Sequence, residues 1–359
     1  MSNNIRVVRP HRLIPGMTLA LDLEYNDTVL LKKDVVLTRK YIEKILKIDE
    51  TLSVFIKGDF KEDKNIQNFI DESSKNLKNK VHVLENMSNN VKTIFNDFEF
   101  HSPQSMTHLK NVQNEIAKEF TDFRNTLVNI IGRDPNNEYL YSHSINVAIL
   151  SYMLGKWLEL EDDELNNLLY AALLHDIGKI KIDHTVLNKI NKLTQKEYEY
   201  IQKHALIGYE VLKDIPHLDR SVSMGVLMHH ERMDGSGYPL KITGNQIHKF
   251  GRIIAITDAF SAMNTERSYK KKYSPLKALA IMHKESLHKY DYTYWNTFLN
   301  NMINYYTGER VLLNTKEEGK IIQVNKKHLS KPLIVLDDSQ VIDLSKDKDR
   351  FVVDIIDSE

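Results

Sequence analysis

The stretch MHHERMDGSGYP, residues 228–239, sets two histidines side by side and then runs through a glycine-rich turn to Tyr-Pro. Adjacent residues of a helix point about 100° apart, so His229 and His230 cannot both lie on one buried stripe. A histidine pair that ends a helical pattern and leads into such a turn therefore predicts that something is bound between the two rings.

The bulk composition limits the function classes. The chain has 359 residues, enough for two or three domains. Its 49 Lys and Arg balance its 49 Asp and Glu, so we expect it to bind neither a nucleic-acid polymer nor an anionic membrane through a global basic field. The absence of cysteine excludes disulfides, thiolate zinc sites and cysteine nucleophiles. The first residues lack a signal-peptide pattern, and no stretch reaches about 18 uncharged apolar residues, so we expect a cytoplasmic protein.

The spacing of apolar residues divides the chain into four predicted parts. These are a small β-rich α/β domain at 1–58, a helical connector at 59–119, an all-helical domain at 120–307 and a small β domain at 308–359. The predicted fold class is therefore mainly α, with small β-containing domains on both sides. The connector is polar in composition, and it could be a solvated helix or could form a homodimer.

Short runs rich in β-branched residues predict the strands of the flanking domains. In the first domain we expect a hairpin over 29–37, a short helix over 39–48 and a strand over 53–56. In the last domain we expect strands at 310–314, 319–325, 332–337 and 351–356.

Five helical runs of the middle domain each place one or two imidazole or carboxylate side chains on an apolar stripe, and one of these runs covers 201–215. The side chains are His143, His175, Asp176, His204, His229, His230 and Asp258. A single one, such as His204, is typical of a satisfied core histidine. A buried carboxylate such as Asp258 is costly without a cation or a donor, however, and the whole set predicts a metal centre.

The types and number of these side chains indicate which ions they suit. Imidazoles and carboxylates without thiolates favour iron or manganese, with zinc as an alternative. Six or seven ligands are too many for one tetrahedral ion, but they fit two divalent ions that share one carboxylate. Such a pair of ions is typical of enzymes that displace a phosphoryl group.

Taken in order along the chain, these motifs resemble a known family. The motifs are His175-Asp-Ile-Gly-Lys179, His229-His-Glu-Arg232, Asp234-Gly-Ser-Gly-Tyr-Pro239, Arg252-Ile-Ile-Ala-Ile-Thr-Asp258 and Arg267-Ser-Tyr-Lys270. Residues 120–307 resemble the HD-GYP domain, a branch of the HD metal-dependent phosphohydrolases. That family is all-helical and hydrolyses cyclic di-GMP through a centre of two, sometimes three, metal ions. The resemblance therefore implies a cyclic di-GMP phosphodiesterase.

The resemblance also implies a role for each matching residue. His143, His175, Asp176 and Asp258 would hold one ion, and His204, His229 and His230 the other, with Asp176 as the bridge. Lys179 would contact the scissile phosphate, Arg267 and Lys270 would bind phosphate oxygens, and Tyr238 would lie against a guanine base. Family members with a third metal have a glutamate at the position of Tyr139, which favours two ions here.

The expected reaction follows from that centre. A hydroxide bridging the two ions would attack phosphorus in line and give linear pGpG, and further cleavage would give GMP. Two alternatives stay open: a catalytically inactive receptor for cyclic di-GMP, and an HD-type hydrolase of another cyclic dinucleotide or nucleotide. Without the resemblance, Arg267 and Lys270 would be interpreted as a solvated basic patch and Gly-Tyr-Pro as a simple turn.

Overall fold

The computed structural model of the chain divides it into two compact units, residues 75–299 and residues 1–74 with 300–359, which we describe separately. The residues that the structure describes are 5–8, 10, 13, 16–25, 28–38, 41–42, 44–45, 52, 54–57, 86–98, 104–119, 139–187, 189, 191–265 and 272–356. The division into four domains that the sequence suggests stays a prediction.

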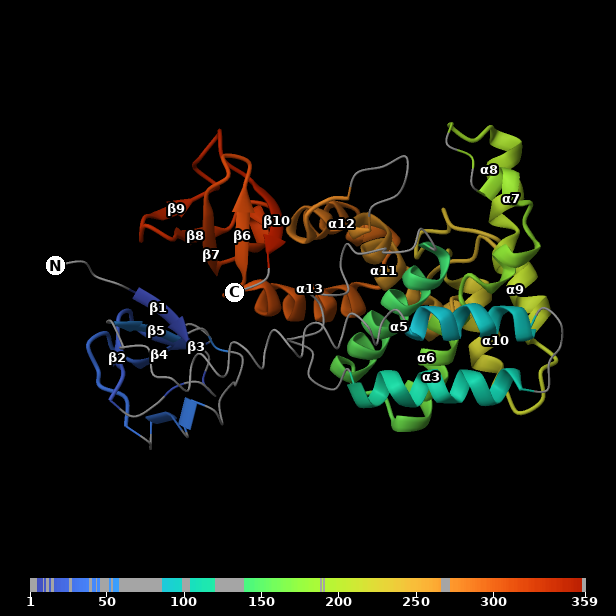
Figure 1. Cartoon of the computed structure of the whole chain (residues 1–359), viewed down its shortest axis with the longest axis horizontal. Coiled ribbons are helices and arrows are strands. Elements are labelled where there is room, and N and C mark those ends of the chain that lie inside the picture. The colour runs from blue at the N-terminus through green and yellow to red at the C-terminus, as the bar shows by residue number, and fades with distance from the viewer. Residues whose placement is uncertain are drawn as a thin grey trace. The chain divides into compact units, whose positions relative to one another are not determined.

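The larger unit is built from helices, and its described residues contain no β-strand (Figure 1). Besides a helix over 86–98, its elements are α3 (Ser105–Glu119), α5 (Tyr139–Trp157), α6 (Asp162–Leu174), η3 (Ile177–Lys181), α7 (His184–Leu187), α8 (Gln195–Gln202), α9 (His204–Leu212), α10 (Arg220–Met228), η4 (Gly244–Gln246), α11 (Lys249–Asn264), α12 (Pro275–Lys289) and α13 (Tyr292–Tyr306), the last of which runs on into the other unit. The mainly α fold class is confirmed.

Close helix packing brings the ends of several helices together. Helix α5 packs on α6 and α11, while α10 packs on α6, α9 and α11. A Cβ added at Gly225 of α10 would lie only 2.9 Å from the Cβ of Phe250 and 3.0 Å from that of Ala171, so a larger residue would push α10 away from its neighbours. A Cβ at Gly178 would collide with the carbonyl oxygen of His204, so η3 lies directly against the start of α9.

The predicted single helix over 201–215 is wrong, because the chain breaks into α8 and α9 at Lys203. The Lys203 amide donates to the carbonyl of Tyr200 at 3.2 Å, three residues back, which is the tighter bonding typical of a helix terminus. The apolar stripe continues across this break, so periodicity alone did not reveal it. As a result, His204 occupies the first turn of a new helix.

Part of the predicted connector packs on the larger unit. Helix α3 contacts α6, and the side-chain amide of Gln113 donates to Asn166 Oδ1 at 2.7 Å. Its apolar residues Leu109, Val112 and Ile116 are buried, so the expectation of a solvated helix is wrong for α3. Residues 59–85 and 99–103 of the predicted connector lie outside the described residues.

The N-terminal part of the smaller unit holds two small sheets. Strands β1 (Ile5–Val8), β5 (Val54–Lys57) and β2 (Thr18–Leu19) form an antiparallel sheet in that order, and β3 (Leu23–Tyr25) pairs with β4 (Thr28–Leu31). The predicted hairpin over 29–37 is therefore wrong. The turn at Asp34, whose φ is 69°, directs the chain toward β2 instead, where the Leu19 amide donates to the Val35 carbonyl.

The C-terminal part is one antiparallel sheet in the order β10-β6-β7-β8-β9. Its strands are β6 (Arg310–Leu313), β7 (Glu318–Gln323), β8 (Leu333–Leu336), β9 (Val341–Asp343) and β10 (Val352–Ile356). The four predicted strands are confirmed, and β9 was missed because three residues are too short to show alternation.

Nowhere in the described part of the chain is a helix both long and apolar enough to cross a membrane.

Candidate metal centre

Five helical elements bring the seven predicted ligands together, most of them at helix ends. His143 lies in α5 and Asp258 in α11, whereas His175 and Asp176 follow the last residue of α6. His204 opens α9, and the pair at 229–230 directly follows α10. The packing of these helices therefore brings residues that are far apart in the sequence together in one buried site.

The ligand atoms fall into two groups, within each of which they lie within 4.8 Å of one another. One group is Asp176, His204, His229 and His230, and the other is His143, His175 and Asp258. Asp176 lies between the groups, because its Oδ1 is 3.3 Å from His204 Nε2 while its Oδ2 is 3.4 Å from His175 Nε2. In the second group His143 Nε2 lies 3.0 Å from Asp258 Oδ1.

Backbone carbonyls set the tautomer of three of the histidines. The Nδ1 atoms of His175, His204 and His229 lie 2.8, 2.7 and 2.6 Å from the carbonyl oxygen three residues earlier. A carbonyl can only accept, so each Nδ1 carries the proton and donates, and each Nε2 presents a lone pair to the interior.

The nitrogens that face inward are placed for a cation. His204 Nε2 and His229 Nε2 lie 3.3 Å apart. Since both are unprotonated in these tautomers, two lone pairs face each other with no proton between them. Two imidazole nitrogens that share one ion at about 2.1 Å each have a similar separation.

Burial and charge hold these ligands in the states that bind metal. Burial disfavours the imidazolium and lowers the pKa of His204 to about 4, and it holds the pKa values of His229 and His230 well below the usual range. Burial would raise the pKa of Asp176, but the charges of Lys179 and His175 outweigh it and keep that pKa low. Metal ligands must be deprotonated, and most of this set is so before any ion binds.

His175 and the second carboxylate complete the charge pattern. Burial also opposes the charged form of His175, but the neighbouring Asp176 carboxylate more than offsets this and raises the pKa of His175. The pKa of Asp258 stays well below its usual range, because a hydrogen bond from His143 and the nearby imidazoles outweigh its burial. The interior therefore holds two ionised carboxylates.

Unpartnered polar atoms show that the residues present fit a metal. Within the part of the chain that the structure describes, His175 Nε2 and Asp176 Oδ1 are buried and have no hydrogen-bond partner. Buried polar atoms without partners are rare because each costs about 1–3 kcal/mol. A cation would satisfy both atoms, and the imidazole and carboxylate donors suit iron, manganese or zinc.

The residues expected to contact substrate are only partly described. Lys179 lies on η3, and its ammonium donates to Asp176 Oδ2 at 2.5 Å while 18% of the side chain stays exposed. Tyr238 lies over His230, with ring centroids 4.5 Å apart and 31° between the planes. Arg267 and Lys270 lie outside the described residues.

The two adjacent histidines are arranged differently from the prediction. Their ring centroids are only 4.0 Å apart, with 43° between the planes, so the rings do not splay to opposite sides. Helix α10 ends at Met228, and the angular separation expected within a helix therefore does not apply. Both rings join the same group.

Sequence reasoning assigned no role to two further residues of the centre. Glu231 is buried, and its Oε1 accepts from the amides of Leu240 at 2.6 Å and Lys241 at 3.1 Å, which folds the Gly-Tyr-Pro loop back over His230. Ser261 Oγ lies 3.0 Å from His143 Nδ1. The position of Glu231 inside the motif was the available signal.

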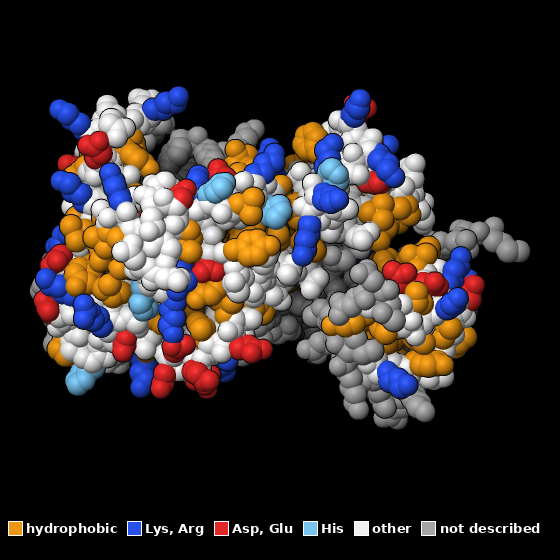
Figure 2. Space-filling model, turned by 180° about the vertical axis from the view of Figure 1, so that it is seen from behind, with side chains coloured by type: hydrophobic (Ala, Val, Ile, Leu, Met, Phe, Trp, Pro, Cys, Tyr) orange, Lys and Arg blue, Asp and Glu red, His pale blue; other side chains and the backbone are white. Residues whose placement is uncertain are grey.

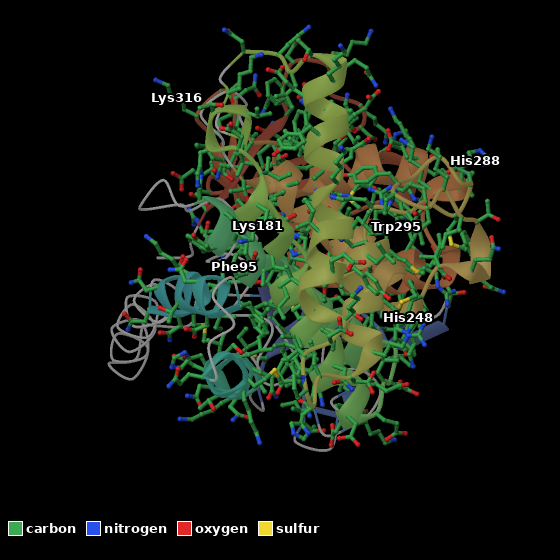
Figure 3. The ribbon with its side chains drawn as sticks, turned by 90° about the vertical axis from the view of Figure 1, so that its right-hand side faces the viewer. Phe95, Lys181, His248, His288, Trp295 and Lys316 are labelled. Atoms are coloured by element: carbon green, nitrogen blue, oxygen red, sulfur yellow. The ribbon has the colours of Figure 1, made fainter. Side chains whose placement is uncertain are left out.

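Among the described residues, no histidine other than the five predicted ones joins the two groups. His288 is exposed and lies at the outer edge in Figure 3, while Trp295 lies in the interior. His248 caps α11 by accepting from the Phe250 amide, and His283 Nδ1 accepts from the indole of Trp295. On the face that Figure 2 presents, acidic and basic side chains are interspersed, as the balanced composition predicts.

Comparison with known proteins agrees with this site. Residues 126–294 match the HD domain family. The chain is 29% identical to cyclic di-GMP phosphodiesterase PA4108 of Pseudomonas aeruginosa, over 67% of this chain and 58% of that protein. It is 36% identical to 3'3'-cGAMP-specific phosphodiesterase 3 of Vibrio cholerae, over 43% of this chain and 33% of that protein.

A solved structure shows the same fold. The structure of Bd1817, an HDG"Y"P protein from Bdellovibrio bacteriovorus, superposes with a TM-score of 0.51 and 14% identity, over 83% of this chain and 99% of that one. HD domains bind divalent metal ions, and the two ligand groups lie within the matched residues. The match of residues 126–294 to the HD domain family agrees with the resemblance to HD-GYP domains.

Proposed function

We propose that this chain is a phosphodiesterase that hydrolyses cyclic di-GMP to linear pGpG and, on further cleavage, to GMP. The observation that carries the proposal is the pair of adjoining groups with Asp176 between them, in which His175 Nε2 and Asp176 Oδ1 are buried and lack partners among the described residues. Relatives that are named as cyclic dinucleotide phosphodiesterases support it, although the chain spans only 58% and 33% of the two compared above.

The proposed centre holds two divalent ions, with iron or manganese as the first choice and zinc as the alternative. His143, His175 and Asp258 would hold one ion and His204, His229 and His230 the other, with Asp176 shared. When bound, two such ions make hydroxide available near neutral pH and neutralise charge that develops on a phosphoryl group.

The chain's own residues would position the substrate. The ammonium of Lys179 lies against Asp176 and is partly exposed, so it can contact a phosphate oxygen at the edge of the centre. The Tyr238 ring offers an aromatic face beside His230 on which a guanine base can stack. Arg267 and Lys270 would bind the phosphates, as the resemblance implies.

The name of the Vibrio cholerae relative favours one further candidate substrate, 3'3'-cGAMP. It has the same phosphodiester ring and one guanine base, so the centre could not discriminate through the metal ligands alone. Discrimination would have to come from contacts to the second base.

One experiment separates these readings. The full chain is purified without oxygen in the presence of Fe²⁺ or Mn²⁺, its metal content is measured by plasma mass spectrometry, and digests of both dinucleotides are separated by chromatography. Two ions with pGpG or GMP as product support the proposal. Two ions and tight binding without product indicate a receptor, and faster cleavage of 3'3'-cGAMP indicates the other substrate. A protein without bound metal refutes all three proposals.

The cytoplasmic location and a homodimer through residues 59–119 stay predictions.

A further inference from the structure

The Nδ1 atom of His143 has a different kind of partner from the Nδ1 atoms of three other histidines of the centre. The Nδ1 atoms of His175, His204 and His229 each face a backbone carbonyl. His143 Nδ1 instead faces the hydroxyl of Ser261, 3.0 Å away on α11, and this serine is only 3% exposed. A carbonyl only accepts, whereas a hydroxyl can accept or donate, so the two kinds of partner constrain an imidazole differently.

The second nitrogen of His143 also has a bonded partner, since its Nε2 lies 3.0 Å from Asp258 Oδ1. In its neutral form the ring carries one proton, which only one of the two nitrogens can hold. The Asp258 carboxylate can only accept, so without a cation that proton is on Nε2 and is donated to Asp258. Ser261 then donates its hydroxyl proton to Nδ1.

A cation in this group needs the opposite tautomer. His143 must present the lone pair of Nε2, so the ring proton moves to Nδ1 and no proton is lost. Nδ1 then donates to Ser261 Oγ, and the serine hydroxyl turns to donate to a carbonyl of the preceding turn of its helix. A backbone carbonyl in place of Ser261 could not support both states.

We propose that Ser261 is a positioning residue that allows His143 to exchange tautomers, and that the group of His143, His175 and Asp258 is consequently the weaker of the two cation sites. Binding there must break the bond between His143 and Asp258, whereas His204 and His229 already present their lone pairs. The inference rests on the proposed metal centre and does not depend on the identity of the substrate.

Nitrogen-15 NMR of the imidazoles in the metal-free full chain tests the tautomers directly, with His143→Gln to assign the signal. We expect the proton of His143 on Nε2 and those of His204 and His229 on Nδ1. A metal-free His143 that carries its proton on Nδ1 would overturn the proposal.

Titration of the metal-free protein with Mn²⁺ alone tests the consequence. Ser261→Ala leaves the Nδ1 proton of the bound state without an acceptor, so the weaker Mn²⁺ affinity should fall by about 10- to 100-fold while the tighter one is unchanged. Ser261→Thr keeps the hydroxyl and should restore the weaker affinity.

Ser151→Ala is the matched control. Ser151 Oγ bonds to Thr257 Oγ1 at 2.7 Å and joins the same helices, α5 and α11, without facing a ligand nitrogen. This variant should bind both ions as the wild type does. The proposal is refuted if Ser261→Ala leaves both affinities unchanged or if Ser151→Ala weakens binding equally. A wild-type protein that binds no Mn²⁺ would instead refute the proposed metal centre, and this inference with it.

Discussion

Replacement of Glu231 by alanine should loosen the loop that carries Tyr238 while the metal ligands stay in place. The Glu231 carboxylate accepts from the amides of Leu240 and Lys241, and its other oxygen has no hydrogen-bond partner among the described residues. A Cβ added at Gly237 would lie 2.5 Å from the carbonyl oxygen of His230, so the loop packs closely against the backbone at this position.

The expected magnitude follows from the two bonds. A backbone amide that donates to a carboxylate contributes about 1.5–3 kcal/mol, and two amides that share one oxygen contribute less than twice that, so we expect a loss of about 2–3 kcal/mol. Each 1.4 kcal/mol is about a tenfold change in an equilibrium constant, so the opening of the loop should become about 30- to 150-fold more frequent. Glu231→Gln keeps an accepting oxygen without the charge and should lose about half of that free energy.

Hydrogen exchange at the amides of residues 240 and 241 measures this opening. Asp234→Ala is the matched control, because the Asp234 carboxylate also accepts from a backbone amide in the same loop, that of Ser236, but at an exposed position. We expect this control to change exchange at residues 240 and 241 by less than threefold, since exposed bonds contribute little. Exchange at wild-type rates in Glu231→Ala, or equal acceleration in the Asp234 variant, would show that Glu231 does not hold the loop.

Three further predictions concern the centre itself. His204→Ala should retain one of two bound ions and lose hydrolysis of cyclic di-GMP, and plasma mass spectrometry that still finds two ions would contradict the ligand assignment. Tyr238→Ala should lower affinity for cyclic di-GMP by about tenfold, since stacking of one base contributes about 1–3 kcal/mol. The same change should leave cleavage of bis-p-nitrophenyl phosphate unchanged. Equal losses on both substrates would count against base stacking. The pKa of His204 lies at about 4 in the folded state against 6.5 when unfolded, so below pH 6.5 the unfolded chain binds the proton first. The contribution of His204 to the free energy of unfolding of the metal-free protein should therefore be complete above pH 6.5. It should fall by about 3 kcal/mol as the pH falls to about 4, as measured by urea unfolding with a chelator present. A His204→Gln protein with an equally steep pH dependence would argue against this cause.

The sequence predicted the members of the centre better than their arrangement. The candidate ligands could be found because polar side chains on apolar stripes violate the ordinary pattern of a core, and both Asp176 and Asp258 are indeed buried. The geometry of the histidine pair at 229–230 could not be found in this way, because it depends on α10 ending at Met228, before both histidines. Helix ends depend on backbone bonding, and apolar spacing does not record them.

The same limitation explains the other errors. The apolar spacing over 201–215 continues across Lys203, so the break that places His204 at a helix start left no mark in the spacing. Strand β9 is too short to alternate, and the turn at Asp34 directs residues 35–37 toward β2 and not back along β4. In each case a backbone hydrogen bond decided between structures that the side-chain pattern allowed equally.

Backbone bonding also determines the chemistry of the centre. The carbonyls at positions 172, 201 and 226 belong to helices that are ending or turning, where carbonyl groups lack partners within the helix and are free to accept from an imidazole. A histidine just past such an end gains a fixed tautomer from a group that would otherwise be unsatisfied. His143 lies inside α5, where the carbonyls are already bonded, and so it takes its partner from a neighbouring helix. The position of each histidine along its helix therefore determines whether its tautomer is fixed by a backbone carbonyl or can exchange, as in His143.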